Sequence, residues 1–150
     1  MIKFGKPVAV GVEARLPRLV DALASDDRIE ALWLFGSRAR NEADALSDVD
    51  LAALCRSTLG SRDIADAELA WTALAARSLG TDEVAVQAVN RMPVALRHAI
   101  LRDARLLWSR APERAADFTA ETLKAYLDFA PYLTRYDREL LQQAARGRLR

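Results

Sequence analysis

Two aspartates and a glycine–serine pair are the residues of this 150-residue sequence whose types and spacing favour chemistry. Ten residues separate Ser37 from Asp48, and Asp50 follows two positions later. Side chains alternate along a strand, so Asp48 and Asp50 are expected to point to the same side, about 6.6 Å apart along it. Carboxylates buried at the head of an apolar strand are costly unless they are paired or bind a metal. Carboxylate oxygens are hard ligands, so we expect the bound metal to be Mg²⁺.

The glycine–serine pair follows an apolar run that is typical of a buried strand, at about residues 29–35. Gly36 allows the backbone to turn tightly against a ligand. Ser37 is expected to begin a short helix over about residues 37–42. The hydroxyl of Ser37 and the first free amides of that helix would then face a phosphate. The sequence therefore predicts a phosphate site beside two carboxylates.

The elements that position these residues alternate between strand and helix patterns. Pro17 is expected to break or begin the first helix, because proline fits poorly in a helix interior. The order predicts an α/β fold, a mixed sheet core with flanking helices and a C-terminal helical appendage. The expected strands are 29–35, 49–54, 83–89 and a short edge strand at 105–108, and the expected helices lie within 8–24, at 64–79 before Gly80, after Pro93, and from Pro112 to Leu149.

Length and charge narrow the class of protein. The length suits a single domain over 1–150, which includes C-terminal helices from about residue 112. Its 22 basic and 21 acidic residues leave a net charge of +1, so no extended nucleic-acid binding is expected. No apolar stretch approaches a membrane span, and a cytoplasmic location is the expectation. Cys55, the single cysteine, is expected to pack as a small hydrophobic residue.

The glycine–serine pair, the spacer and the two aspartates together resemble the Gly-Ser-x10-Asp-x-Asp signature of the polymerase-beta-type nucleotidyltransferase superfamily. Within it, the chain resembles the minimal nucleotidyltransferases, in particular the MntA-type antitoxins that are paired with HEPN-domain toxins. The similarity extends to Leu96–Trp108 and to Phe118–Leu141, and so covers most of the chain.

The resemblance implies a role for each residue of the signature. Gly36 and Ser37 would hold the triphosphate of ATP, with Arg38 as a further phosphate contact. Asp48 and Asp50 would bind Mg²⁺. The implied reaction transfers AMP from ATP to a protein hydroxyl with loss of pyrophosphate. In this family the acceptor is a tyrosine of the toxin, which the modification neutralises.

One departure from the family pattern concerns the third carboxylate, which the next strand normally supplies. The resemblance places Ala85 at that position, and alanine can neither bind metal nor accept a proton. Glu83 lies on the same strand face about 6.6 Å away, so it would substitute only through a bulge or a longer reach. Two alternatives therefore stay open beside an enzyme of weak or lost activity. One is a degenerate antitoxin that acts by binding alone, and the other is a small-molecule nucleotidyltransferase.

The remaining candidates are aromatic residues and the single histidine. We expect His98 to be a packing or surface residue, and Trp33, Trp71 and Trp108 to belong to the core. The C-terminal helical region carries more apolar surface than one buried face requires, which fits either packing within the chain or a partner interface. Its residues are Tyr126, Leu127, Phe129, Tyr132, Leu133 and Tyr136.

Overall fold

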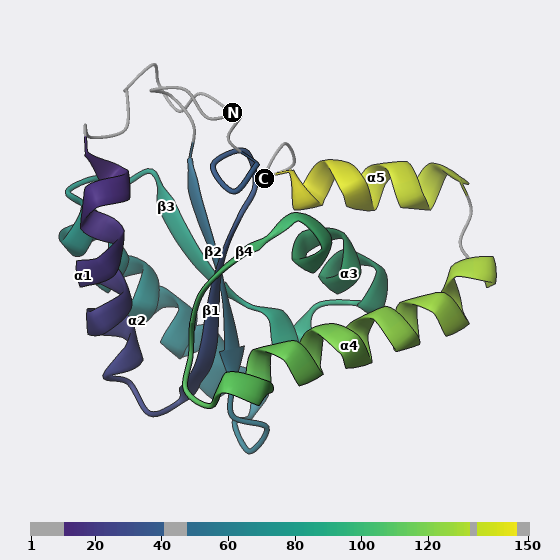
Figure 1. Cartoon of the computed structure of the whole chain (residues 1–150), viewed down its shortest axis with the longest axis horizontal. Coiled ribbons are helices and arrows are strands. Elements are labelled where there is room, and N and C mark those ends of the chain that lie inside the picture. The colour runs from purple at the N-terminus through teal and green to yellow at the C-terminus, as the bar shows by residue number, and fades with distance from the viewer. Residues whose placement is uncertain (1–10, 41–47, 133–134, 147–150) are drawn as a thin grey trace.

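The computed structural model describes residues 11–40, 48–132 and 135–146. Within them it shows a mixed four-stranded sheet flanked by helices, as the strand and helix patterns predict (Figure 1). The elements are α1 (Val12–Ala24), β1 (Ile29–Phe35), β2 (Val49–Cys55), α2 (Ser61–Leu79), β3 (Val84–Ala88), α3 (Val94–Asp103), β4 (Arg105–Ser109), α4 (Pro112–Phe129) and α5 (Arg135–Ala145), with 3-10 turns at Val89–Arg91 and Ala130–Tyr132.

The strands lie in the order β3-β2-β1-β4. β1 is antiparallel to both of its neighbours, whereas β2 and β3 are parallel and are joined through α2. β4 is an edge strand, as expected for its short pattern. Helices α1 and α2 cover one face of the sheet, and α3, α4 and α5 lie on the other side (Figure 1).

Each strand divides its side chains between two cores, because successive residues point to opposite faces of a sheet. On β1, Leu32 and Leu34 pack with α1 and α2, whereas Trp33 and Phe35 pack on the side of α3 and α4. Trp33 and Trp71 are buried, which confirms the expectation for both. Trp108 is half-buried.

The expectation that Pro17 breaks or begins the first helix is wrong, because α1 runs without interruption from Val12 to Ala24. Proline removes one backbone donor from the helix, but Pro17 is exposed, so water can solvate the carbonyl that loses its partner. The opposite face buries Leu16, Leu19 and Leu23 against the core. Burial of that apolar face outweighs the local cost.

The short helix expected over about 37–42 is not seen in the part of it that the structure describes. Residues 37–40 form a turn, and 41–42 lie outside the described residues. A helix of one or two turns gains few hydrogen bonds for the residues that it orders, so it is marginal without a face to bury.

The C-terminal region forms two helices. α4 ends at Phe129, and the 3-10 turn that follows contains Pro131, which cannot continue the hydrogen-bond pattern of a helix. α4 and α5 each pack against α3. None of the helices in the described residues is long and apolar enough to cross a membrane.

Candidate functional site

The two aspartates lie at the start of β2, and Asp50 is on the side of the sheet that α3 and α4 cover. Asp50 is the second residue of the strand, and Asp48 comes immediately before it. Asp50 alternates with Val49 and Leu51, which pack on the opposite face. Asp48 is 6% exposed and Asp50 is 4% exposed. The sheet therefore holds two carboxylates among residues that are otherwise apolar.

Gly36 follows the last residue of β1 and lies directly beside the carboxylate of Asp50. The strand register pairs Phe35 with Asp50, so the next residue turns over the aspartate side chain. Gly36 has a φ of 79°, in the left-handed region that favours glycine. A Cβ placed on Gly36 would lie 2.8 Å from Oδ2 of Asp50. The turn was expected to close against a ligand, and in the structure it closes against a carboxylate of the site itself.

Ser37 and Arg38 follow in the turn of residues 37–40, and both are half-buried. The structure thus places the glycine–serine pair and the aspartates at adjoining ends of β1 and β2. The sequence predicts that the first backbone amides of a helix at Ser37 face a phosphate. Residues 37–40 form a turn and not a helix, so this part of the prediction is not seen in the described residues.

The strand register identifies the neighbours of the aspartates on β3. Asp50 pairs with Ala85, the residue at which the resemblance described above implies a third carboxylate. The amide of Val49 donates a hydrogen bond to the carbonyl of Glu83 at 2.9 Å, so Glu83 lies beside Asp48 at the head of the ladder. Neighbouring strands are about 4.8 Å apart. Glu83 is buried, with 9% of its surface exposed.

These residues offer two carboxylates that suit one hard cation, because hard cations prefer oxygen ligands. Among the described residues, no three histidine, cysteine, aspartate or glutamate side chains are grouped closely enough to hold one metal ion. Glu83 therefore does not converge with Asp48 and Asp50 in this structure. The donor set fits a cation held by the aspartate pair, not a three-carboxylate centre.

Side chains of α2 fix the outer edge of β3, a feature that the sequence analysis missed. The amide of Val86 donates to the hydroxyl of Thr72 at 3.0 Å, and the amide of Ala88 donates to Glu68 at 2.7 Å. Glu68 and Thr72 are four residues apart, so they lie on one side of the helix. Two polar residues at this spacing, in a helix that precedes an edge strand, were the sequence signal for these contacts. The two contacts cover edge amides that would otherwise be open to another strand.

Cys55 and His98 have structural surroundings. Cys55 is fully buried, and burial raises the pKa of its thiol to about 12, which supports the expectation that it packs as a hydrophobic residue. The ring of His98 stacks on Tyr126 with centroids 3.9 Å apart. Burial, and next the charge of Arg102, lowers the pKa of His98. These contacts agree with a packing role for the histidine.

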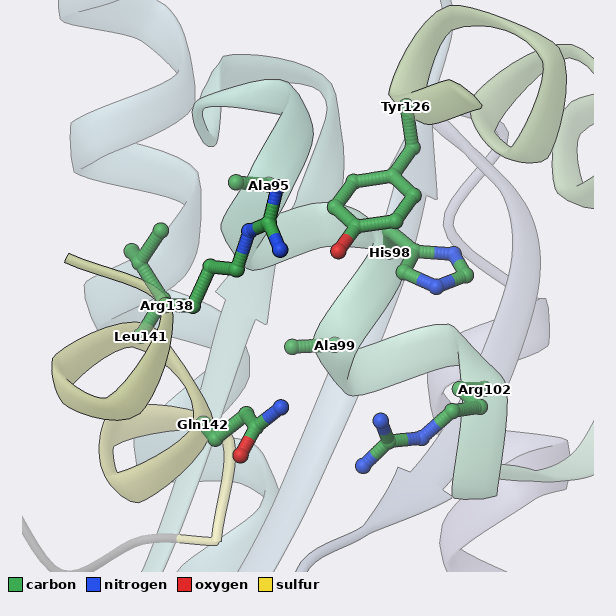
Figure 2. A pocket seen from close by; sticks show the side chains of 8 residues that line it. All are labelled: Ala95, His98, Ala99, Arg102, Tyr126, Arg138, Leu141 and Gln142. Atoms are coloured by element: carbon green, nitrogen blue, oxygen red, sulfur yellow. The ribbon is translucent and has the colours of Figure 1, made fainter. Parts of the chain in front are cut away.

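A small pocket surrounds this stacked pair, between α3, α4 and α5 (Figure 2). Its volume is about 20 Å³, which accommodates a water molecule and no nucleotide. Arg102 and Arg138 border it from α3 and α5. None of the residues predicted for the phosphate or metal site is among those that line it.

Comparison with known proteins adds the family. A family model described as polymerase beta, nucleotidyltransferase matches residues 18–113, a range that includes both aspartates and the turn at Gly36. No curated protein sequence matches the chain. Among solved structures, the chain is similar to a toxin–antitoxin crystallised with AMP-PNP, with a TM-score of 0.63 and 18% identity over 80% of this chain and 90% of that chain.

Two further solved structures are similar to the chain. One is a MntA–HepT toxin–antitoxin, with a TM-score of 0.61 and 18% identity over 80% of this chain and 91% of that chain. The other is a tri-AMPylated Shewanella oneidensis HEPN toxin in complex with MNT antitoxin, with a TM-score of 0.63 and 17% identity over 81% and 91% of the two chains. At this identity the likeness shows the shared fold.

Proposed function

The chain belongs to the polymerase beta nucleotidyltransferase family, and from this we propose that it is an antitoxin that transfers AMP from ATP to a hydroxyl group, a tyrosine, of a HEPN-domain toxin. The observation that carries the proposal is that Gly36 packs closely on the carboxylate of Asp50. This contact brings the turn proposed to bind phosphate next to the aspartates at the start of β2. The likeness to an MNT antitoxin in complex with a tri-AMPylated HEPN toxin supports the choice of substrate.

In this proposal the residues of the site divide into two groups. Gly36, Ser37 and Arg38 hold the phosphates of ATP at the end of β1. Asp48 and Asp50 would hold Mg²⁺, and the ion when bound would offset the negative charge of the triphosphate and of the pyrophosphate that leaves. Burial of both aspartates suits this role, because a bound cation offsets the cost of keeping carboxylates out of water.

The reaction needs a hydroxyl oxygen to attack the α-phosphorus of ATP. A new phosphorus–oxygen bond forms, the bond between the α-phosphorus and the bridging oxygen breaks, and pyrophosphate leaves with the electron pair. The hydroxyl proton must pass to a base. Ala85, the register partner of Asp50, cannot accept it, so the candidate base is Glu83, which immediately precedes β3 and would have to reach from beside Asp48.

Ala85 also favours a second function, neutralisation of the toxin by binding alone. If Glu83 does not replace the missing carboxylate, the chain would bind its toxin and neutralise it by occupancy. ATP could then bind through the aspartate pair without transfer of AMP. The two functions share a partner and differ in covalent modification.

The test uses a HEPN-domain toxin as substrate, sought among the products of the genes that neighbour the one encoding this chain. The two proteins are incubated with ATP labelled at the α-phosphate, with Mg²⁺ or with EDTA, and mass spectrometry locates the AMP. We expect Mg²⁺-dependent labelling of the toxin that Asp48→Asn and Asp50→Asn each abolish. Asp27→Asn is the matched control, since the side chain of Asp27 is 83% exposed. Binding of the toxin without labelling would support the second function, and neither binding nor labelling would contradict both.

A further inference from the structure

Helix α4 buries one face and leaves another apolar face open. The buried face carries Ala115, Phe118 and Thr122, which lie at helical spacing. Phe118 packs near Trp33, with ring centroids 6.3 Å apart, and Tyr126 stacks on His98 of α3. These contacts account for the inward side of the helix. They do not use its exposed leucines.

The open face forms a continuous apolar stripe, which we name the α4 stripe. Residues 116, 120, 123 and 127 recur at intervals of three and four, so they lie along one side of the helix. Leu123 is 45% exposed and Leu127 is 61% exposed. Tyr132, in the 3-10 turn after the helix, is 82% exposed. The stripe consists of Ala116, Ala120, Leu123 and Leu127, all of which are exposed.

A row of charge follows the α4 stripe along one side, and the row is almost entirely acidic. It consists of Glu113, Asp117, Glu121 and Asp128, all exposed, with Lys124 as the basic residue among them. The four carboxylates extend from the first turn of α4 to its last turn. An apolar stripe beside an acidic row is complementary to an apolar surface with arginine or lysine along one rim.

We propose that the α4 stripe is the docking surface for the toxin, and that the toxin meets it with an apolar groove bordered on one side by basic residues. The inference rests on the proposed function for the identity of the partner. The acidic row disfavours a second copy of this chain as the occupant. An antiparallel two-fold pairing of α4 would bring both acidic rows to the same side of the contact, where like charges repel.

The position of the stripe agrees with this role. α4 lies on the same side of the sheet as Asp50, whose strand neighbours Ala52 and Leu54 share a core with Phe118 (Figure 1). A toxin docked on α4 is therefore on the side of the sheet where Asp50 lies. The opposite side, covered by α1 and α2, carries a separate exposed leucine, Leu69.

The decisive variants are two leucine substitutions that differ in location. Leu127→Glu places a charge in the α4 stripe, and Leu69→Glu places the same charge on α2, where the leucine is 74% exposed. Both sites are exposed, so both variants are expected to fold, as circular dichroism would show. In calorimetry with the same HEPN-domain toxin, Leu127→Glu should weaken binding by roughly tenfold or more, and Leu69→Glu should leave the affinity unchanged.

A charge reversal tests the acidic row. Asp117→Lys combined with Glu121→Lys should weaken toxin binding and reduce its dependence on salt, because exposed charge pairs are screened by salt. Unchanged toxin binding by Leu127→Glu, while the unmodified chain binds, would overturn the docking surface and leave the proposed function standing. A dimer of the free chain that Leu127→Glu dissociates would assign the stripe to a second copy. Failure of the unmodified chain to bind the toxin would instead overturn the proposed function.

Discussion

The backbone of Gly36 lies against the carboxylate of Asp50, so closely that a Cβ on the glycine would approach Oδ2 to 2.8 Å. The contact follows from the register of β1 and β2, which pairs Phe35 with Asp50. It joins the two parts of the signature across the ten-residue spacer. The spacing in the sequence therefore corresponds to a single packed contact in the fold.

The first prediction concerns this contact. In Gly36→Ala the new methyl group must displace the Asp50 carboxylate, and an alanine at a φ of 79° also adds strain of about 1–2 kcal/mol. We expect Mg²⁺-dependent ATP binding to fall by at least about tenfold, as measured by calorimetry, since a displaced carboxylate is a lost metal ligand. Thermal unfolding should report only the modest loss of stability.

Gly11→Ala is the matched control for that variant. Gly11 has a φ of 86°, and a Cβ there would meet nothing within 4 Å. It should lose a similar 1–2 kcal/mol of stability, roughly, and keep its ATP affinity. Equal ATP affinity in the two alanine variants would show that Gly36 serves only the backbone turn.

The second prediction concerns the stability of the link between α1 and β1. Asp26 accepts hydrogen bonds from the guanidinium of Arg28 at 2.6 Å and from the indole of Trp71 at 2.8 Å. The side-chain bonds from Arg28 hold the pKa of Asp26 well below its usual range, while burial opposes that shift and Trp71 adds to it. We expect Asp26→Asn to reduce the free energy of unfolding by about 1–3 kcal/mol at pH 7.

The pH dependence of that loss has a definite sign. Because the folded pKa of Asp26 is depressed, its contribution is present above the unfolded pKa and disappears as the pH falls through the folded pKa. Urea unfolding should therefore show the gap between Asp26→Asn and the unmodified chain narrowing below about pH 4. Asp27→Asn, at a side chain 83% exposed, should show no such gap.

The sequence predicted the strands of the sheet and most of its helices, because alternating and helical apolar patterns reflect which faces are buried. It failed at Pro17, where burial of Leu16 and Leu19 against the core outweighs a local propensity. It also failed for the helix after Ser37, whose described part is a turn. Tertiary packing decided the first case, and the second lacks an apolar face that would stabilise a short helix.

At the candidate site, the sequence predicted which residue types belong together but not how the strands align. The spacing to Asp48 and Asp50 was visible, whereas the pairing of Asp50 with Ala85 and the place of Glu83 beside Asp48 depend on a parallel register between strands far apart in sequence. The contact between Thr72 and Val86 is of the same kind. Strand register and contacts of this kind become visible only in the three-dimensional structure.

The third prediction concerns the edge of β3. Thr72→Val keeps the shape of the side chain but removes the acceptor for the amide of Val86. Val86 is buried, with 2% of its surface exposed. We expect a loss of about 1–3 kcal/mol in unfolding free energy, because a buried donor is left unsatisfied. The Val86 amide should also exchange faster with solvent. Thr119→Val is the control, since the exposed Thr119 donates its hydroxyl to the carbonyl of Ala115 within its own helix.

The last prediction separates enzyme from binder through the residue beside Asp50. A carboxylate at position 85 would stand next to Asp50 on the parallel strand, where it could bind a metal or accept the hydroxyl proton. A positioned base contributes roughly 10²–10⁴-fold in rate. We expect Ala85→Asp to raise AMP labelling of the toxin by at least about tenfold, which is a discounted share of that contribution.

Glu83→Gln completes this experiment, because it removes a charge beside Asp48 while keeping the size of the side chain. If Glu83 acts as the substitute base, Glu83→Gln lowers labelling in the unmodified background and has little effect once Ala85→Asp is present. Toxin binding, measured by calorimetry, should stay constant in both variants and so exclude loss of fold as the cause. Efficient labelling by the unmodified chain that neither substitution alters would mean that the base comes from outside β3.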